Sequence, residues 1–114
     1  MTSLAYLTGF VLLAQGCASS RDIDTRHFTR FDEYHANLDI GGHRYMLDAY
    51  IVMFQKPFYI TVTRDDRQGM GVDEAARVAE RYIKPRGCTD PLVRRADLDR
   101  ANADKTQWMI GIEC

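Results

Sequence analysis

The sequence lacks an excess of charge of either sign. Its 114 residues hold 15 Lys and Arg against 16 Asp and Glu, which gives a formal net charge of −1 at pH 7. Electrostatic binding to nucleic acid requires a clustered excess of positive charge. We therefore expect no nucleic-acid partner for this protein.

The apolar run near the start of the chain is too short to cross a bilayer. It extends from Leu4 to Ala14, whereas a transmembrane helix needs about 20 apolar residues. The run carries no charge and ends in Gln15, Gly16 and Cys17. An apolar run that closes on small residues is typical of an export signal rather than of a folded domain.

Recognisable catalytic and metal-binding patterns are also missing. The chain contains no Gly-x-Ser-x-Gly element, and the spacing of its three cysteines fits no zinc motif. A pair of adjacent carboxylates, Asp65 and Asp66, lacks the alternating ligand pattern of a calcium loop and indicates a solvated turn. We predict no catalytic residue, no metal site and no cofactor.

The residues Leu13-Ala14-Gln15-Gly16-Cys17 resemble the cleavage box of bacterial lipoproteins. The resemblance implies that residues 1–16 are a signal peptide, and that Cys17 becomes the lipidated, palmitate-bearing N-terminus of the mature protein. Because Ala18 rather than Asp follows the cysteine, it also implies delivery to the outer membrane, facing the periplasm. Plain secretion after cleavage and a buried N-terminal element are the alternatives.

The two remaining cysteines, Cys88 and Cys114, form a candidate disulfide once Cys17 is assigned to lipid. An odd cysteine is unusual in an exported protein, and a disulfide persists in an oxidising periplasm. The bond would close a loop of about 25 residues and contribute on the order of 3 kcal/mol to stability. Two unrelated buried thiols are the alternative interpretation.

The first structured element is predicted in register. From Asp32 to Ile40 apolar and polar residues alternate, and the following pair Gly41-Gly42 suits a tight hairpin turn into a strand from His43 to about Phe54. The register places Leu38 opposite Tyr45, Ala36 opposite Leu47, Tyr34 opposite Ala49, Asp39 opposite Arg44, and His35 opposite Asp48. We interpret His35 and Asp48 as a surface contact, since no nucleophile accompanies them.

The remaining elements follow from periodicity and turn residues. Alternation predicts a third strand over Phe58 to Arg64 and a closing strand over Gln107 to Cys114. Between them, helical spacing begins at Val72 and is ended by Pro85-Arg86-Gly87, and the solvated stretch 89–105 holds a short helical turn around Asp97 to Ala101. Residues 17–30 then form a polar tether, and residues 31–114 a single domain.

The order strand, strand, strand, helix, strand predicts an α+β fold, a small two-layer sandwich with a mostly antiparallel sheet and one packing helix. The helix should cover the face that carries Ala36, Leu38, Tyr45, Leu47, Ile60 and Trp108. How the last strand pairs in the sheet is not encoded in any pattern that we recognise.

The second face of the sheet is the candidate interaction surface. Its expected residues are more aromatic and apolar than solvent contact requires: Met46, Tyr50, Val52, Phe54, Tyr59 and Thr61. The alternative is that the N-terminal segment or the stretch 89–105 covers this face. The sequence favours a non-enzymatic envelope lipoprotein that docks on a protein or on the cell wall; a small periplasmic enzyme, an enzyme inhibitor or a ligand-binding module is the alternative.

Overall fold

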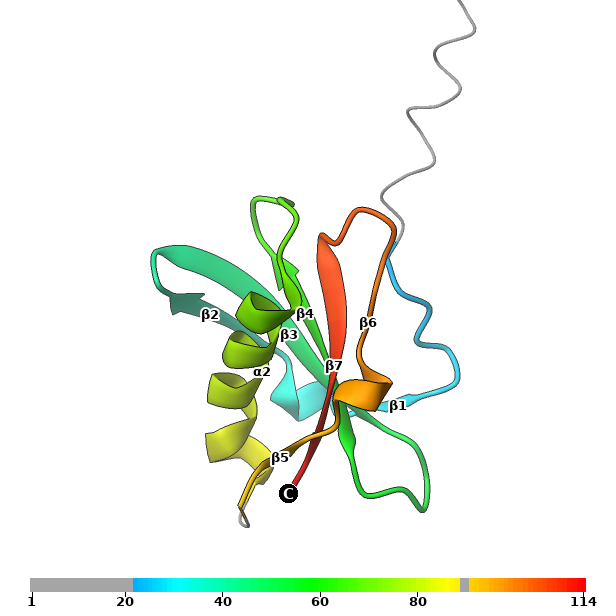
Figure 1. The fold of residues 1–114 in the computed structure, drawn as a ribbon. Coiled ribbons are helices and arrows are strands. Elements are labelled where there is room, and N and C mark those ends of the chain that lie inside the picture. Colours follow the sequence, from blue (N-terminus) through cyan, green and yellow to red (C-terminus); the bar gives the residue numbers. More distant parts are fainter. Residues whose placement is uncertain (1–21, 89–90) are drawn as a thin grey trace, which may run out of the picture.

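A single described α-helix lies across one face of a seven-stranded sheet (Figure 1). The computed structural model describes residues 22–88 and 91–114. The predicted signal segment and Cys17 lie outside the described residues. The α+β sandwich predicted from the order of the elements is confirmed.

The elements follow one another as three strands, a helix and a last long strand. The long elements are β2 (Ala36–Ile40), β3 (His43–Ile51), β4 (Phe58–Arg64), α2 (Val72–Gly87) and β7 (Gln107–Glu113). The short ones are β1 (Thr29–Arg30), the 3-10 turn η2 (Asp32–Tyr34), β5 (Val93–Arg94), the 3-10 turn η3 (Ala96–Leu98) and β6 (Arg100–Ala101).

The predicted register of the first hairpin is confirmed over β2 and β3. Leu38 pairs with Tyr45, Ala36 with Leu47, and Asp39 with Arg44. Gly41 and Gly42 have φ angles of 60° and 85°, the left-handed values that the tight turn requires and that glycine adopts without strain. Because one face of these strands is buried, a slip by one residue would expose the apolar set.

Tyr34 does not continue the first strand as predicted. The turn η2 interrupts the ladder there, so that Phe31, and not Tyr34, bonds Ala49: its N–H donates to the Ala49 carbonyl at 2.9 Å. The turn aims Tyr34 at the helix, where its hydroxyl donates to the carbonyl of Arg86 at 2.6 Å. Tyr34 thus contacts the helix instead of pairing with Ala49 in the sheet.

The end of α2 is fixed by a reciprocal contact with η2. Tyr82 donates its hydroxyl hydrogen bond to the carbonyl of Tyr34, while Arg86 donates to the carbonyl of Tyr82 at 2.8 Å and lies 4.6 Å above its ring. Burial raises the pKa of the Tyr82 hydroxyl, which therefore remains a donor. These bonds hold the last turn, so the helix continues past Pro85 to Gly87 rather than ending at the proline.

The last strand lies inside the sheet, between β4 and the short strands β5 and β6. Ile110 pairs with Ile60 and Trp108 with Val62, both antiparallel. The strand order is β1-β3-β4-β7-β5, with β2 also paired to β3 and β6 to β7. Strands β4 and β5 are both antiparallel to β7 and are therefore parallel to each other. Helix α2 follows β4 in the chain and precedes β5, and β7 lies between these two strands in the sheet.

The core lies between the helix and the face predicted for it. Its fully buried side chains include Leu47, Ile60, Ile110, Tyr82 and Ile83, and Ala36, Leu38 and Trp108 pack against them. The Sγ atoms of Cys88, just after the helix, and Cys114, just after β7, lie at disulfide distance with their Cα atoms 5.2 Å apart. This link joins the end of the helix to the middle of the sheet.

Candidate functional site

The second face of the sheet is covered, in contrast to the open interaction surface expected from the sequence. Tyr59 and Thr61 are only 6% and 4% exposed. The segment 22–28, here called the strap, lies on this face: the N–H of Ile23 donates to Gln107 Oε1 at 2.6 Å, and the ring of Phe28 lies 4.8 Å from that of Tyr59. The half-buried Tyr50 also contacts Phe28, with ring centroids 6.2 Å apart.

The stretch after the helix covers the β7 side of this face, whereas Met46, on β3 near the first hairpin turn, remains 39% exposed. A Cβ added to Gly111 would lie 2.8 Å from the Leu98 Cβ and 2.8 Å from the Arg95 carbonyl, so η3 rests directly on β7. Met109, in the middle of the face, is fully buried. The N-terminal segment and the stretch 89–105, the alternative cover considered from the sequence, therefore both contribute. The prediction that Tyr59 and Thr61 lie on the surface is wrong, because both are buried.

Val52 and Phe54 are not on the sheet at all. Strand β3 ends at Ile51, and the N–H of Gln55 donates to the Val52 carbonyl at 3.0 Å, closing a turn. The sequence predicted a strand to Phe54 because the apolar run continues that far. The run instead forms residues 52–57, here called the tip loop, which connects β3 to β4.

Phe54 is the most unusual residue of the tip loop. Its side chain is fully exposed, at 101%, and its backbone has a φ of 68°. A non-glycine residue in the left-handed region costs on the order of 1 to 3 kcal/mol, and such strain concentrates at functional positions. Its neighbour Met53 is 63% exposed. Neither side chain contributes to the core, so the domain gains no stability from presenting them.

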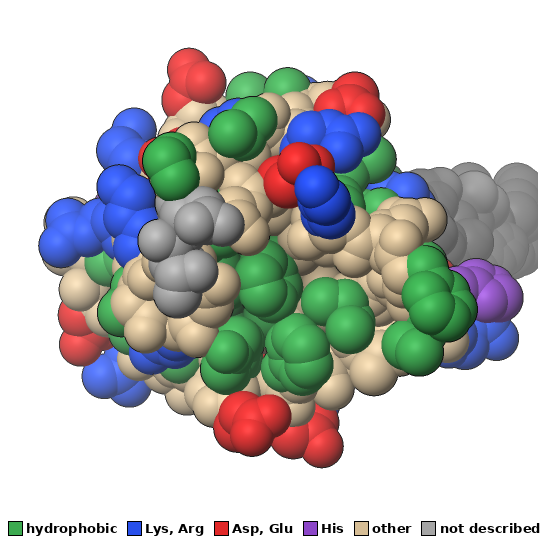
Figure 2. Space-filling view, turned by 90° about the horizontal axis from the view of Figure 1, so that it is seen from below, with side chains coloured by type: hydrophobic (Ala, Val, Ile, Leu, Met, Phe, Trp, Pro, Cys, Tyr) green, Lys and Arg blue, Asp and Glu red, His purple; other side chains and the backbone are tan. Residues whose placement is uncertain are grey.

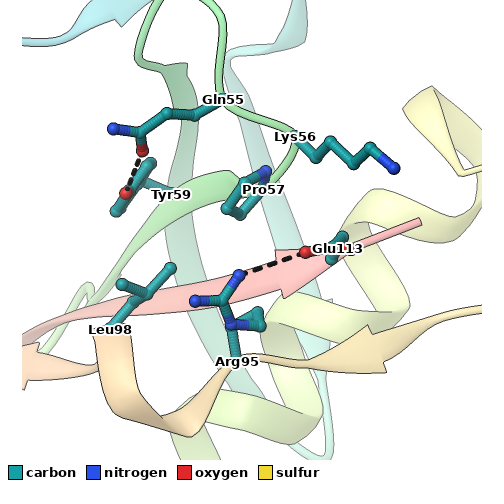
Figure 3. A pocket seen from close by; sticks show the side chains of 7 residues that line it. All are labelled: Gln55, Lys56, Pro57, Tyr59, Arg95, Leu98 and Glu113. Atoms are coloured by element: carbon teal, nitrogen blue, oxygen red, sulfur yellow. Dashed lines mark hydrogen bonds and ion pairs between the residues drawn. The ribbon is translucent and has the colours of Figure 1, made fainter.

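Beside the tip loop lies a groove made of two depressions that share Lys56 and Glu113. The first, of about 440 Å³, is shown in Figure 3 and is lined by Gln55, Lys56, Pro57, Tyr59, Arg95, Leu98 and Glu113. The second is lined by Lys56, Pro91, Val93, Glu113 and Cys114. We call the two together the tip groove.

Hydrogen bonds fix both walls of the tip groove. On one side Tyr59 donates to Gln55 Oε1 at 2.8 Å, and on the other Arg95 bonds Glu113 at 3.1 Å, with Pro57 between them (Figure 3). Arg95 also bonds Asp97 at 2.9 Å, and this hydrogen bond holds the pKa of the Asp97 carboxyl below its usual value. The groove is thus held in shape before any partner arrives.

Lys56 is the groove's unpaired charge. Arg95 and Glu113 neutralise each other, whereas the Lys56 ammonium has no ion pair or hydrogen bond among the residues that the structure describes. Figure 2 shows this end of the molecule, where hydrophobic side chains gather over the middle of the face and acidic side chains line one rim. Together the groove and the tip loop combine apolar side chains with the unpaired ammonium of Lys56.

The predicted contact of His35 and Asp48 is present, with Nδ1 2.7 Å from Oδ1. Thr61, which pairs with Asp48 in the sheet, is buried, and the described part of the chain contains no serine. Neither His35 nor Asp48 has a hydrogen bond from a side-chain hydroxyl among the described residues. Within residues 22–88 and 91–114, no three His, Cys, Asp or Glu side chains converge as metal ligands.

No helix in the described ranges has the length and apolar character needed to cross a membrane. Comparison of the chain with protein-family models, curated proteins and solved structures finds no significant match.

Sequence reasoning identified Phe54 but missed Met53, Lys56, Arg95, Leu98 and Glu113 as neighbours of one groove. The signal for the loop was present: Val52-Met53-Phe54 runs into Gln55-Lys56-Pro57, and proline cannot donate to a ladder. The groove itself depends on η3 lying over β7, which no local pattern indicates.

Replacing Phe54 with glycine should stabilise the domain by about 1 kcal/mol, because glycine adopts a positive φ without strain and the exposed ring has no contacts to lose. Urea unfolding measures the change. Met53→Gly is the matched control: Met53 has no positive φ, so glycine there should not raise stability. A loss of stability in Phe54→Gly would show that the ring supports the fold.

Proposed function

We propose that this protein is a non-enzymatic lipoprotein of the cell envelope, anchored to the outer membrane through Cys17, whose domain docks on another envelope protein through the tip loop and tip groove. The observation that carries the proposal is Phe54, a fully exposed aromatic side chain held in a strained backbone conformation at a loop tip. An exposed aromatic anchor next to a rigid groove is the usual composition of a protein-binding hot spot.

The path of the chain supports this orientation. The strap begins beside the loop after β4, where Arg67 bonds Asp22 at 3.2 Å, whereas the tip loop precedes β4 and lies at the other end of that strand (Figure 1). Four residues separate Cys17 from Asp22, and the five Cα–Cα steps between the two residues span at most roughly 18 Å. A lipid on Cys17 would therefore hold the strap end near the membrane and point the tip loop away from it.

The chemistry of the tip groove supports one kind of occupant, an extended protein segment with apolar side chains and a carboxylate. Pro57, Leu98 and Val93 offer apolar walls, and Lys56 offers the only cation of the groove without a partner in the described chain. A carboxylate placed on Lys56 gives this ammonium an ion-pair partner, and complementary charge sets specificity and association rate. Phe54 and Met53 then enter an apolar surface of the partner.

The mass of the protein extracted from membranes tests the anchoring. We expect loss of residues 1–16, an added mass of acyl chains on Cys17, and a gain of two hydrogens on reduction, since Cys88 and Cys114 lie at disulfide distance. Retention of Met1 would contradict the lipid anchor. An unchanged mass after reduction would contradict the disulfide alone.

A charge exchange at Lys56 tests the docking. The wild-type protein should bind a short peptide of alternating leucine and glutamate more tightly than its leucine and lysine counterpart, and Lys56→Glu should reverse this order, each by about tenfold. Fluorescence anisotropy of labelled peptides gives both affinities. Phe54→Ser should weaken both.

Lys84→Glu is the matched control, because it makes the same charge change on an exposed lysine of α2 that lines neither depression of the tip groove. It should leave the preference unchanged. Equal effects of Lys56→Glu and Lys84→Glu would show general electrostatics and sink the assignment of the groove.

A further inference from the structure

Most of the described arginines are neutralised by a nearby carboxylate. The arginines in ion pairs are Arg26, Arg30, Arg44, Arg64, Arg67, Arg94 and Arg95. Arg86 instead stacks on Tyr82. Only the guanidinium groups of Arg77, Arg81 and Arg100 have neither an ion pair nor a hydrogen bond within the described residues. Two of these three exceptions lie in one groove.

Arg77 and Arg81 lie four residues apart on α2, so they stand on the same side of the helix. They line a depression of about 480 Å³ between the helix and the first hairpin, here called the helix groove. Its other lining residues are Ile40, Gly41, His43, Tyr45, Glu74 and Val78. Two like charges at this spacing repel each other, and neither guanidinium forms an ion pair with a carboxylate of the described chain.

The carboxylate of the helix groove is already occupied. Glu74 Oε2 accepts a hydrogen bond from the Tyr45 hydroxyl at 2.6 Å and lies 3.4 Å from Arg64 Nη1. Burial, together with this bond to Glu74, raises the pKa of Tyr45 to about 12, so the hydroxyl stays protonated and remains a donor to Glu74. The Oε2 atom of Glu74 is thereby committed to Tyr45 and Arg64.

His43 supplies a further donor in the helix groove. Its Nδ1 lies 3.2 Å from Arg64 Nη2. A guanidinium can only donate, so Nδ1 is the acceptor and the proton of the neutral ring resides on Nε2. The groove therefore combines two guanidinium groups and an imidazole N–H, all without an acceptor. Gly41 adds no side chain, and a Cβ there would meet nothing within 4 Å.

We infer that the helix groove binds a phosphate group, held by Arg77 and Arg81 with His43 as the third donor. A planar carboxylate is satisfied by one guanidinium fork, whereas the several oxygens of a phosphate accept from two forks and an N–H at once. The same chemistry is offered by free phosphate and by the phosphodiester of a phospholipid headgroup. This site does not depend on the proposed docking function.

Titration of the full chain with three soluble probes tests the inference: inorganic phosphate, glycerophosphoglycerol as the headgroup phosphodiester, and acetate. The readout is the NMR shift of the Gly41, His43, Arg77 and Arg81 signals. We expect saturable shifts with at least one phosphate probe and weaker binding of acetate. Tighter binding of glycerophosphoglycerol assigns a lipid headgroup as the source, and tighter binding of inorganic phosphate assigns the free ion.

The double variant Arg77→Gln, Arg81→Gln should weaken phosphate binding by at least about tenfold, the usual effect of losing charge-assisted hydrogen bonds. Arg100→Gln is the matched control, because it removes the third unpaired arginine, on β6, outside the groove. Circular dichroism verifies that both variants fold, and the lysine double variant should retain part of the affinity. Absence of shifts with both phosphate probes, or equal losses in the double variant and Arg100→Gln, would overturn the site.

Discussion

One helix can cover only one face of a sheet, and the structure depends on how the other face is kept from water. The described chain seals it with segments that have little regular structure, the strap on one side and η3 on the other. The polar groups beneath are satisfied, because Gln107 accepts from the Ile23 N–H and donates to Thr63 Oγ1 at 3.1 Å. A buried amide of this kind is stable only when its hydrogen bonds are made. The β4 and β7 part of the face predicted to bind partners is therefore part of the interior.

The two edges of the sheet are built in the same way, which follows from the same constraint. On each side a two-residue strand is interrupted by a 3-10 turn before pairing resumes: β1, η2 and β2 on β3, and β5, η3 and β6 on β7. Such interruptions prevent an exposed edge from pairing with another chain. Each turn also places one side chain against the body of the domain. Tyr34 of η2 contacts the helix, and Leu98 of η3 packs on Gly111. With most of both faces covered, the candidate binding surfaces are the tip groove at one end and the helix groove beside α2.

Local pattern predicted what depends on neighbours in sequence. The alternation of Leu38, Tyr45 and their neighbours determined the hairpin register, and Phe58–Arg64 was predicted with its observed bounds. Local pattern failed where a distant contact decides the conformation. Tyr34 leaves its strand to reach Arg86, and Phe54 leaves a run of strand-forming residues for a turn. The tip groove could not be predicted because Lys56, Arg95 and Glu113 meet only once β7 lies between β4 and β5.

The central claim is that the second face is closed and the tip loop is open, and the methionines report on both. Met109 is fully buried in that face, Met70 is 3% exposed in the helix-side core, and Met53 in the tip loop is 63% exposed. Limited oxidation with peroxide, followed by peptide mass spectrometry, measures their relative access to solvent. We expect rapid oxidation of Met53, with Met109 as protected as Met70. Oxidation of Met109 at the rate of Met53 would contradict this claim.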